Sequence, residues 1–191
     1  MNLDIAEYKG LEEICPCGFT WKHRAIKIVE TFFLGNGENA AAAVQKASEI
    51  IPADFVPKKE RIAETLGALE LEMPADADFT ALFIYVNELH IFSAGSDSVL
   101  LVREGEVEDR TEVIAPESGR IAYSPSIIIR HGDFILLGNR PFMEKLSKTE
   151  LQIAACKAAD AREFLDELLL RLLSKEKILD PAMTAKVIFV K

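Results

Sequence analysis

Cysteine, histidine and tryptophan are scarce in this sequence of 191 residues, which has three cysteines, three histidines and one tryptophan. An odd number of cysteines argues against a disulfide framework and favours a reducing compartment. Long hydrophobic runs are also missing, since no apolar stretch approaches the roughly 20 residues that a membrane-spanning helix needs. The acidic and mixed start, MNLDIAEYKGLEEI, does not have the pattern of a signal peptide. We therefore expect a cytoplasmic protein without a membrane partner.

Positive charge is in the minority. Lysine and arginine number 22 against 31 aspartates and glutamates, which gives a net charge of −9. A phosphate backbone binds to cationic surfaces, so this balance disfavours a nucleic-acid partner. With 49% hydrophobic residues the composition is that of an ordinary globular protein, and the length predicts a single domain over residues 1–191.

The hydrophobic pattern changes twice along the chain. It predicts one strand, then two helices, then about six short strands, then two helices and a closing strand. The predicted strands are 25–33, 79–86, 89–94, 98–103, 106–113, 121–130, 134–137 and 184–190, and the predicted helices are 38–51, 58–71, 147–158 and 160–175. Ser147 and Glu150 have the spacing of a capping box, and Asp160 and Glu163 repeat it. Paired helices around a meander of strands predict antiparallel sheets covered by helices, and not a parallel sheet.

Taken one by one, the polar motifs allow a site but do not require it. The turn Gly35-Asn36-Gly37 opens a helix and could hold a phosphate, but it is also an ordinary turn with a backbone that suits glycine. Cys15 and Cys17, with His23 six residues on, are too few ligands for a convincing zinc site.

Two aspartates occupy comparable positions. Asp97 lies at a strand–turn junction and Asp133 precedes a strand, where both residues suit either a metal ion or plain turn chemistry. The scattered histidines predict no catalytic constellation.

Several stretches in this order resemble the PPM or type 2C family of metal-dependent serine/threonine protein phosphatases. The matching segments are Phe33–Glu38 for a DGHGG-like turn, Phe79–Leu82 for a TTA-like strand, Ala94–Leu101 with Arg103–Gly105 for a GDSRAYL-like turn, Gly132–Phe142 for a GD.lLL.SDGL-like turn, and Asp180–Ile188 for a DN.T strand. The resemblance covers nearly the whole chain. It implies an α+β fold, namely a four-layer αββα sandwich of two antiparallel sheets flanked by helix pairs. The short span between Arg110 and Ile127 implies that the family's flap subdomain is reduced or absent.

The family's chemistry, as the resemblance implies it, is hydrolysis with two Mg²⁺ or Mn²⁺ ions held by aspartates. Here the aspartate of the DG turn is Leu34, followed by Gly35, and the aspartate of the SDG turn is Arg140. The DN aspartate aligns with Pro181, and the first-strand aspartate falls near His23 or Arg24.

We therefore expect a degenerate site bounded by Leu34, Gly35, Ser96, Arg140 and Pro181, with no metal and no cofactor. The chain would be a pseudophosphatase, that is, a regulatory or protein-interaction module. Its partner would be a protein, such as a phosphoprotein whose phosphate pairs with Arg140 and is not hydrolysed.

Two alternatives stay open at this point. A divergent but active phosphatase would use Asp97, Asp133 and Asp180 around a shifted Mg²⁺ or Mn²⁺ ion. A different αββα protein, an amidohydrolase with an N-terminal nucleophile, would need Cys15 or Cys17 exposed by processing.

Overall fold

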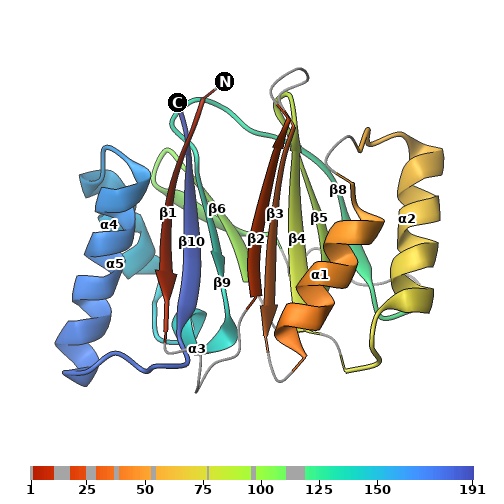
Figure 1. The fold of residues 1–191 in the computed structure, drawn as a ribbon. Helices are drawn as coiled ribbons and strands as arrows, with labels where there is room; N and C mark the ends of the chain where they lie inside the picture. The colour runs from red at the N-terminus through yellow and green to blue at the C-terminus, as the bar shows by residue number, and fades with distance from the viewer. Residues whose placement is uncertain are drawn as a thin grey trace. The chain divides into compact units, whose positions relative to one another are not determined.

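The structure is a computed structural model that describes residues 2–10, 18–24, 29–36, 39–52, 55–76, 78–95, 98–110 and 119–191 (Figure 1). The chain divides into two compact units. Unit 1 comprises Met1–Cys15, Ser98–Thr111 and Arg130–Lys191, and unit 2 comprises Pro16–Asp97 and Glu112–Ile129. Each unit contains one antiparallel sheet of five strands with its own helices.

The sheet of unit 1 has the strand order β1-β10-β9-β6-β7. Its strands are β1 (Leu3–Lys9), β6 (Ser98–Arg103), β7 (Glu106–Asp109), β9 (Phe134–Gly138) and β10 (Thr184–Val190). The first and last strands of the chain are neighbours, and Asn2 and Lys191 exchange backbone hydrogen bonds of 3.2 and 2.8 Å.

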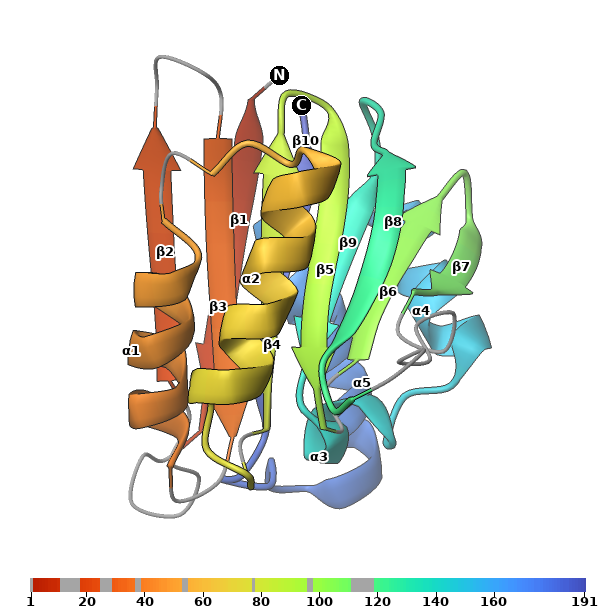
Figure 2. The same cartoon turned by 90° about the vertical axis from the view of Figure 1, so that its right-hand side faces the viewer.

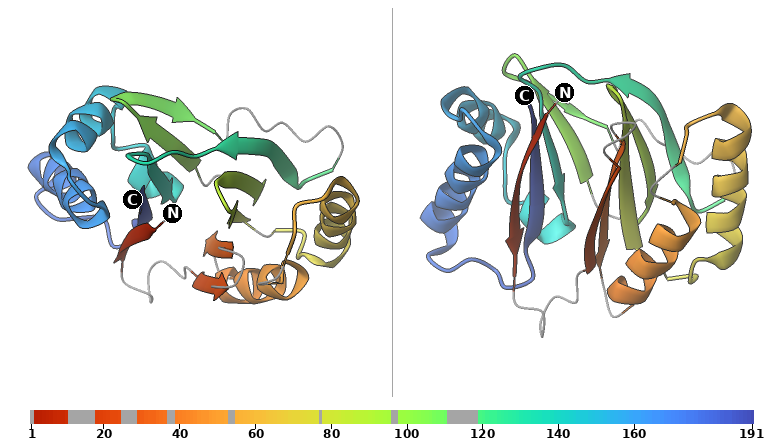
Figure 3. Two further views of the ribbon diagram at one scale, coloured as in Figure 1. Left: turned by 90° about the horizontal axis from the view of Figure 1, so that it is seen from above. Right: turned by 45° about the horizontal axis from the view of Figure 1, so that its top comes forward.

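Three helices belong to unit 1, namely α3 (Arg140–Met143), α4 (Lys148–Lys157) and α5 (Ala161–Glu176). In Figure 3, α4 and α5 lie together on one face of this sheet. A stripe of α5 side chains is buried because apolar residues recur at helical spacing: Ala161, Phe164, Leu165, Leu168 and Leu172. They join alternate residues of β9 and β10, such as Phe134 and Val187, in one hydrophobic core.

The sheet of unit 2 has the strand order β2-β3-β4-β5-β8. Its strands are β2 (Gly18–Arg24), β3 (Val29–Asn36), β4 (Asp78–Tyr85), β5 (Glu88–Ala94) and β8 (Ala122–Ile128). Helices α1 (Ala40–Ile50) and α2 (Lys59–Glu72) cover one face of it, as Figure 2 shows.

The core of unit 2 lies between these helices and the sheet. It contains Phe79, Phe83 and Phe92 from the sheet, with Val44 and Leu69 from the helices. Alternation along β4 and β5 explains this arrangement, since every second side chain points to the helix-covered face.

Most elements confirm the expectation from the sequence. The strands 98–103 and 184–190 have the expected bounds, and the helices α1, α2, α4 and α5 are found within about two residues of their expected positions. The capping box of Ser147 and Glu150 is complete. Asp160 caps α5, although Glu163 accepts from the N–H of Ala159 instead of from the cap residue.

The N-terminal part needs a correction. The expected strand 25–33 is replaced by the hairpin of β2 and β3, and residues 25–28 lie outside the described residues. Strand β1 and the short helix α3 were not expected. The expected strand 106–113 is described only as β7, since residues 111–118 are not described. The reduced flap and the single-domain assignment stay predictions.

Among the helices that the structure describes, none combines the length and apolar character needed to cross a lipid bilayer.

Candidate functional site

Leu34 lies near the end of β3 and is fully buried, with 0% of its surface exposed. On the neighbouring strands it is opposite Thr80 of β4 and Phe19 of β2. Its side chain is purely hydrocarbon and offers no oxygen to a hard cation. At the position where the resembling family has a metal-binding aspartate, this chain therefore has a packed core residue.

Gly35 is a glycine because helix α1 comes close to it. A Cβ atom at this position would lie 2.9 Å from both the carbonyl oxygen of Ala40 and a methyl carbon of Val44. The described glycines with a left-handed backbone do not include Gly35, so the expected positive φ is corrected to a packing requirement here. Gly37 lies outside the described residues.

The strand register shows where His23 and Arg24 lie relative to Leu34. His23 pairs with Glu30 and Arg24 with Val29, at the far end of the hairpin from Leu34. The residues next to Leu34 on β2 are Gly18 and Phe19. The expected aspartate position near His23 or Arg24 is therefore distant from Leu34 along the hairpin, and residues 11–17 before β2 are not described.

In unit 1, Asn139 joins the turn after β9 to the loop before β10. Its side-chain amide donates to the carbonyl of Ala182 at 2.7 Å, and its side-chain oxygen accepts from the N–H groups of Thr184 at 2.9 Å and Phe142 at 3.3 Å. The residue is 2% exposed. These bonds hold the turn that carries Arg140 next to the loop that carries Pro181. The turn that begins at Asn139 and the loop that ends at Thr184 are therefore neighbours within unit 1, and the expected convergence of Arg140 and Pro181 stays a prediction.

Asp180 closes the loop before β10. Its Oδ1 accepts from the N–H of Ala182 at 2.9 Å, and its carbonyl accepts from Met183 at 3.0 Å. A Cβ atom on Gly10 would collide with the carbonyl of Pro181, so the loop also packs tightly against the end of β1. In this structure the carboxylate of Asp180 therefore accepts a hydrogen bond within its own turn.

Arg140 is the first residue of α3, and 66% of its side-chain surface is exposed. Its Nε donates to Oε1 of Glu144 at 2.5 Å, one helical turn further on. A cation at this position opposes the binding of a dication, because like charges repel. The planar guanidinium suits phosphate, for which Glu144 is an internal competitor.

Asp133 belongs to a different cluster. Its side chain is 2% exposed and accepts from Nε of Arg103 at 2.9 Å, from a terminal nitrogen of Arg103 at 2.6 Å and from the N–H of Arg130 at 2.7 Å. The bond to Asp133 is the main reason that the pKa of Arg103 is raised. The carboxylate is therefore fully engaged in a bidentate ion pair.

Asp133 and Asp180 lie at opposite ends of β10. The carbonyl of Asp133 accepts from the N–H of Val190, at the end of this strand, whereas Asp180 precedes its start. A strand of seven residues spans roughly 20 Å. One ion cannot contact both carboxylates, which corrects the alternative in which Asp97, Asp133 and Asp180 share a shifted metal. Asp97 and Ser96 themselves lie outside the described residues.

The donor set does not fit the metal pair of the phosphatase family. Leu34 is hydrocarbon, Arg140 is cationic, and Pro181 has no side-chain donor. Within the described part of the chain, no group of three or more histidine, cysteine, aspartate or glutamate side chains could hold a metal ion.

The whole chain has the fold of the PPM-type serine/threonine phosphatases, which confirms the expected fold class of two antiparallel sheets with helices. The serine/threonine phosphatase of S. agalactiae matches with a TM-score of 0.67 at 12% identity, over 100% of this chain and 99% of that one. The phosphatase domain of the cell fate determinant SpoIIE from Bacillus subtilis, solved with a fragment of its regulatory domain, matches with a TM-score of 0.72 at 12% identity, over 100% of this chain and 64% of that one.

The phosphatase PstP/Ppp of Mycobacterium tuberculosis has a TM-score of 0.63 at 16% identity, over 100% of this chain and 98% of that one. No family model and no curated protein matches the sequence. At identities this low, the structural likeness establishes the fold alone. The activity has to be argued from the residues of the site.

Sequence reasoning missed two of the groups that shape this region. Asn139 carries a weak signal as a helix cap before Arg140-Pro141, since Pro is common in the first turn of a helix. The pairing of Arg103 with Asp133 has no local signal, because the two residues are 30 positions apart. Cys15 and Cys17 lie outside the described residues.

Proposed function

We propose that this chain is a phosphatase-fold protein without the phosphatase metal centre, and that it acts as a regulatory or protein-interaction module. The observation that carries the proposal is Leu34, which is fully buried where a metal ligand is needed. Arg140 and Pro181 add two further losses on the turns that Asn139 joins. Losing one ligand weakens a metal site, but replacing ligands by hydrocarbon and by a cation removes the reason for an ion to bind.

The partner we propose is a phosphorylated protein that is bound without hydrolysis. The guanidinium of Arg140 is exposed and presents planar donors in a fork, which is the geometry that recognises phosphate. On binding, the guanidinium of Arg140 would leave the carboxylate of Glu144 and pair with the phosphate, which carries more negative charge. The net charge of −9 leaves a protein as the better candidate than a nucleic acid.

Two of the similar structures belong to regulatory systems. SpoIIE is described as a cell fate determinant, and PppA of Pseudomonas aeruginosa as a key regulatory component of a type VI secretion system. They support a role in protein regulation, and we place that role in the cytoplasm on the composition of the chain.

The first experiment measures metal binding and turnover. We expect titration calorimetry with Mn²⁺ to show no binding at millimolar concentration, and an aryl phosphate with Mn²⁺ to show no turnover above the buffer rate. The reason is the missing oxygen donors at Leu34, Arg140 and Pro181. Turnover that depends on Mn²⁺ and disappears in Asp97→Asn would establish an active phosphatase and overturn the proposal.

The second experiment measures phosphopeptide binding by fluorescence anisotropy with a library of phosphoserine and phosphothreonine peptides. We expect Arg140→Ala to weaken binding about tenfold or more, since a charge-assisted hydrogen bond contributes about 1.5–3 kcal/mol. Glu144→Gln removes the internal competitor and should strengthen binding.

Arg162→Ala is the matched control. Arg162 forms the same type of exposed i,i+4 pair, with Asp166 at 3.1 Å, and lies on α5 of the same unit. Equal loss in Arg140→Ala and Arg162→Ala, or no binding by the wild type, would remove Arg140 from its proposed role.

A further inference from the structure

The pairing of the edge strand β8 with β5 is interrupted beside His90. Leu89 pairs with Ile127, but the next pair joins Ile91 to Ser124, so β8 has two residues opposite the single residue His90. This is a β-bulge, at which ladder bonds are lost. One of these two residues is Pro125, which has no N–H to donate. The attachment of β8 therefore depends more than usual on side chains at this point.

The ring of His90 bridges the two strands at the bulge. Its Nδ1 lies 2.7 Å from the hydroxyl of Tyr123 on β8, and the two rings are stacked with centroids 6.1 Å apart. His90 is 2% exposed. Its Nε2 has no hydrogen-bond partner among the described residues, although a carboxylate oxygen of Glu88 lies 3.5 Å away. The arrangement fits a neutral ring whose Nδ1 accepts from Tyr123 and whose Nε2 carries the proton.

The surroundings disfavour a charged ring. Burial lowers the pKa of His90, and the neighbouring carboxylate of Glu88 opposes that effect without cancelling it. Burial also raises the pKa of Tyr123 to about 12, so this side chain remains a phenol at neutral pH. From β4, the apolar ring of Phe83 lies at a centroid distance of 6.1 Å from the His90 ring, with the two planes tilted by 52°. Glu88 and Tyr123 are thus the titratable groups that face His90 in the described part of unit 2.

We propose that His90 and Tyr123 form a pH-sensitive clasp that holds β8 to β5 and opens when the protein is acidified. A second proton must go to Nδ1, where it removes the acceptor of the Tyr123 hydroxyl and puts a positive charge into a buried site. In the open state the ring is hydrated and binds the proton at its ordinary pKa of about 6.5. Acid therefore favours the open state, with the change setting in below about pH 6.5.

Opening of the clasp exposes the edge of β5. β8 is an edge strand, so its release leaves the N–H and C=O groups of β5 unpaired. This consequence is independent of the role proposed for Arg140, since His90, Tyr123 and Glu88 all belong to unit 2.

Amide hydrogen exchange by NMR between pH 7.5 and 5.5 tests the clasp, after correction for the intrinsic exchange rate. In the wild type we expect the protection of Ser124 and Ile127 to fall by up to about tenfold over this range, because each pH unit below the ordinary pKa changes the open fraction by at most that factor. The protection of the β4 amides paired with β3 should stay constant, which separates local opening from a general loss of stability.

Variants assign the effect to the clasp. His90→Asn keeps a hydrogen-bonding group near the position of Nδ1 but cannot titrate, so the pH dependence should disappear. Tyr123→Phe should reduce the protection of β8 already at pH 7.5. Titration of the His90 ring in the wild type, followed by NMR, should give a midpoint below 6.5 and does not depend on any variant folding. A midpoint of 6.5 or more, constant protection of β8 down to pH 5.5, or an unchanged pH dependence in His90→Asn would overturn the proposal.

Discussion

Asn139 shows how much one residue contributes to the junction between the turn after β9 and the loop before β10. Its backbone N–H donates to the carbonyl of Thr184 at 3.1 Å, and its side chain makes three further hydrogen bonds to two different segments. A carboxylate would turn the donor toward Ala182 into an acceptor facing an acceptor. The amide is therefore the side chain that this junction requires, and its job is to hold two loops together.

We expect Asn139→Ala to lower the free energy of unfolding by about 2–3 kcal/mol. The substitution removes the hydrogen bonds that the Asn139 side chain makes to the carbonyl of Ala182 and to the N–H of Thr184, and each such loss costs about 1–3 kcal/mol. Urea denaturation measures the change. Asn39→Ala is the control, because Asn39 is exposed, makes no side-chain cap bond and, in the part of the chain that the structure describes, donates from its side chain to Asp76 at 2.9 Å. A loss as small as that of the control, about 0.5 kcal/mol, would show that the junction does not depend on Asn139.

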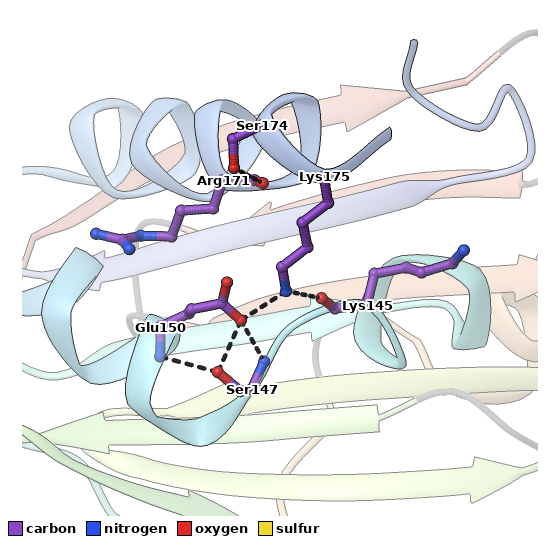
Figure 4. Close-up of polar contacts among 6 residues, drawn as sticks. All are labelled: Lys145, Ser147, Glu150, Arg171, Ser174 and Lys175. Carbon is purple, nitrogen blue, oxygen red and sulfur yellow. Dashed lines mark hydrogen bonds and ion pairs between the residues drawn. The ribbon is translucent and has the colours of Figure 1, made fainter. Parts of the chain in front are cut away.

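At the scale of elements, helices α4 and α5 are tied together by polar contacts at one end (Figure 4). Ser147 and Glu150 cap the start of α4, and Lys175 reaches over from the last turn of α5. The ammonium of Lys175 donates to Glu150 at 2.7 Å and to the carbonyl of Lys145 at 2.6 Å. One carboxylate thus completes a cap and joins two helices, while the dipole at the helix start favours its charge.

These contacts predict a dependence of stability on pH. The hydrogen bond from Lys175, followed by those from Ser147, lowers the pKa of Glu150 from 4.5 to about 2. A carboxylate whose pKa is lowered by folding stabilises the folded state at any pH above the pKa that it has in the unfolded chain. The contribution of Glu150 is therefore complete above pH 4.5 and is lost as the pH falls toward 2.

The test compares urea unfolding of the wild type and Glu150→Gln over this range. We expect Glu150→Gln to be less stable by about 1 kcal/mol at pH 7, the usual value of a cap, and the difference to shrink below pH 4.5. Asp166→Asn, which removes an exposed pair on α5, should cost no more than about 0.5 kcal/mol. A difference between wild type and Glu150→Gln that does not change with pH would contradict the assignment.

At the scale of the whole molecule, the chain has the phosphatase fold although Leu34, Arg140 and Pro181 offer no carboxylate. Both sheets and their helices match the phosphatase structures over the full length of the chain. The apolar alternation of the strands and the apolar stripes of the helices build this fold, and neither requires an aspartate at a turn. Fold and activity therefore rest on different residues.

The sequence predicted the central and C-terminal elements well because their signals are local. Strand 98–103 is an apolar run that ends at the turn Glu104-Gly105, and α5 has a cap and a stripe. Strand β1 was not predicted, because it lies at an edge of the sheet and mixes charged with apolar residues. Helix α3 has only four residues, too few to show a helical period.

The sequence by itself determined which side chains offer no ligand oxygen, because leucine is hydrocarbon and arginine is a cation in any fold. It also determined the order of the elements, since caps, turns and apolar periods act over a few residues. Only the tertiary structure decided that Asn139 joins two turns, that Asp133 is engaged by Arg103 far from Asp180, and that His90 lies at a bulge against Tyr123. These relations depend on strand pairing between segments distant in sequence, and the free energy that selects a register comes from burial and hydrogen bonds made only after the sheets form.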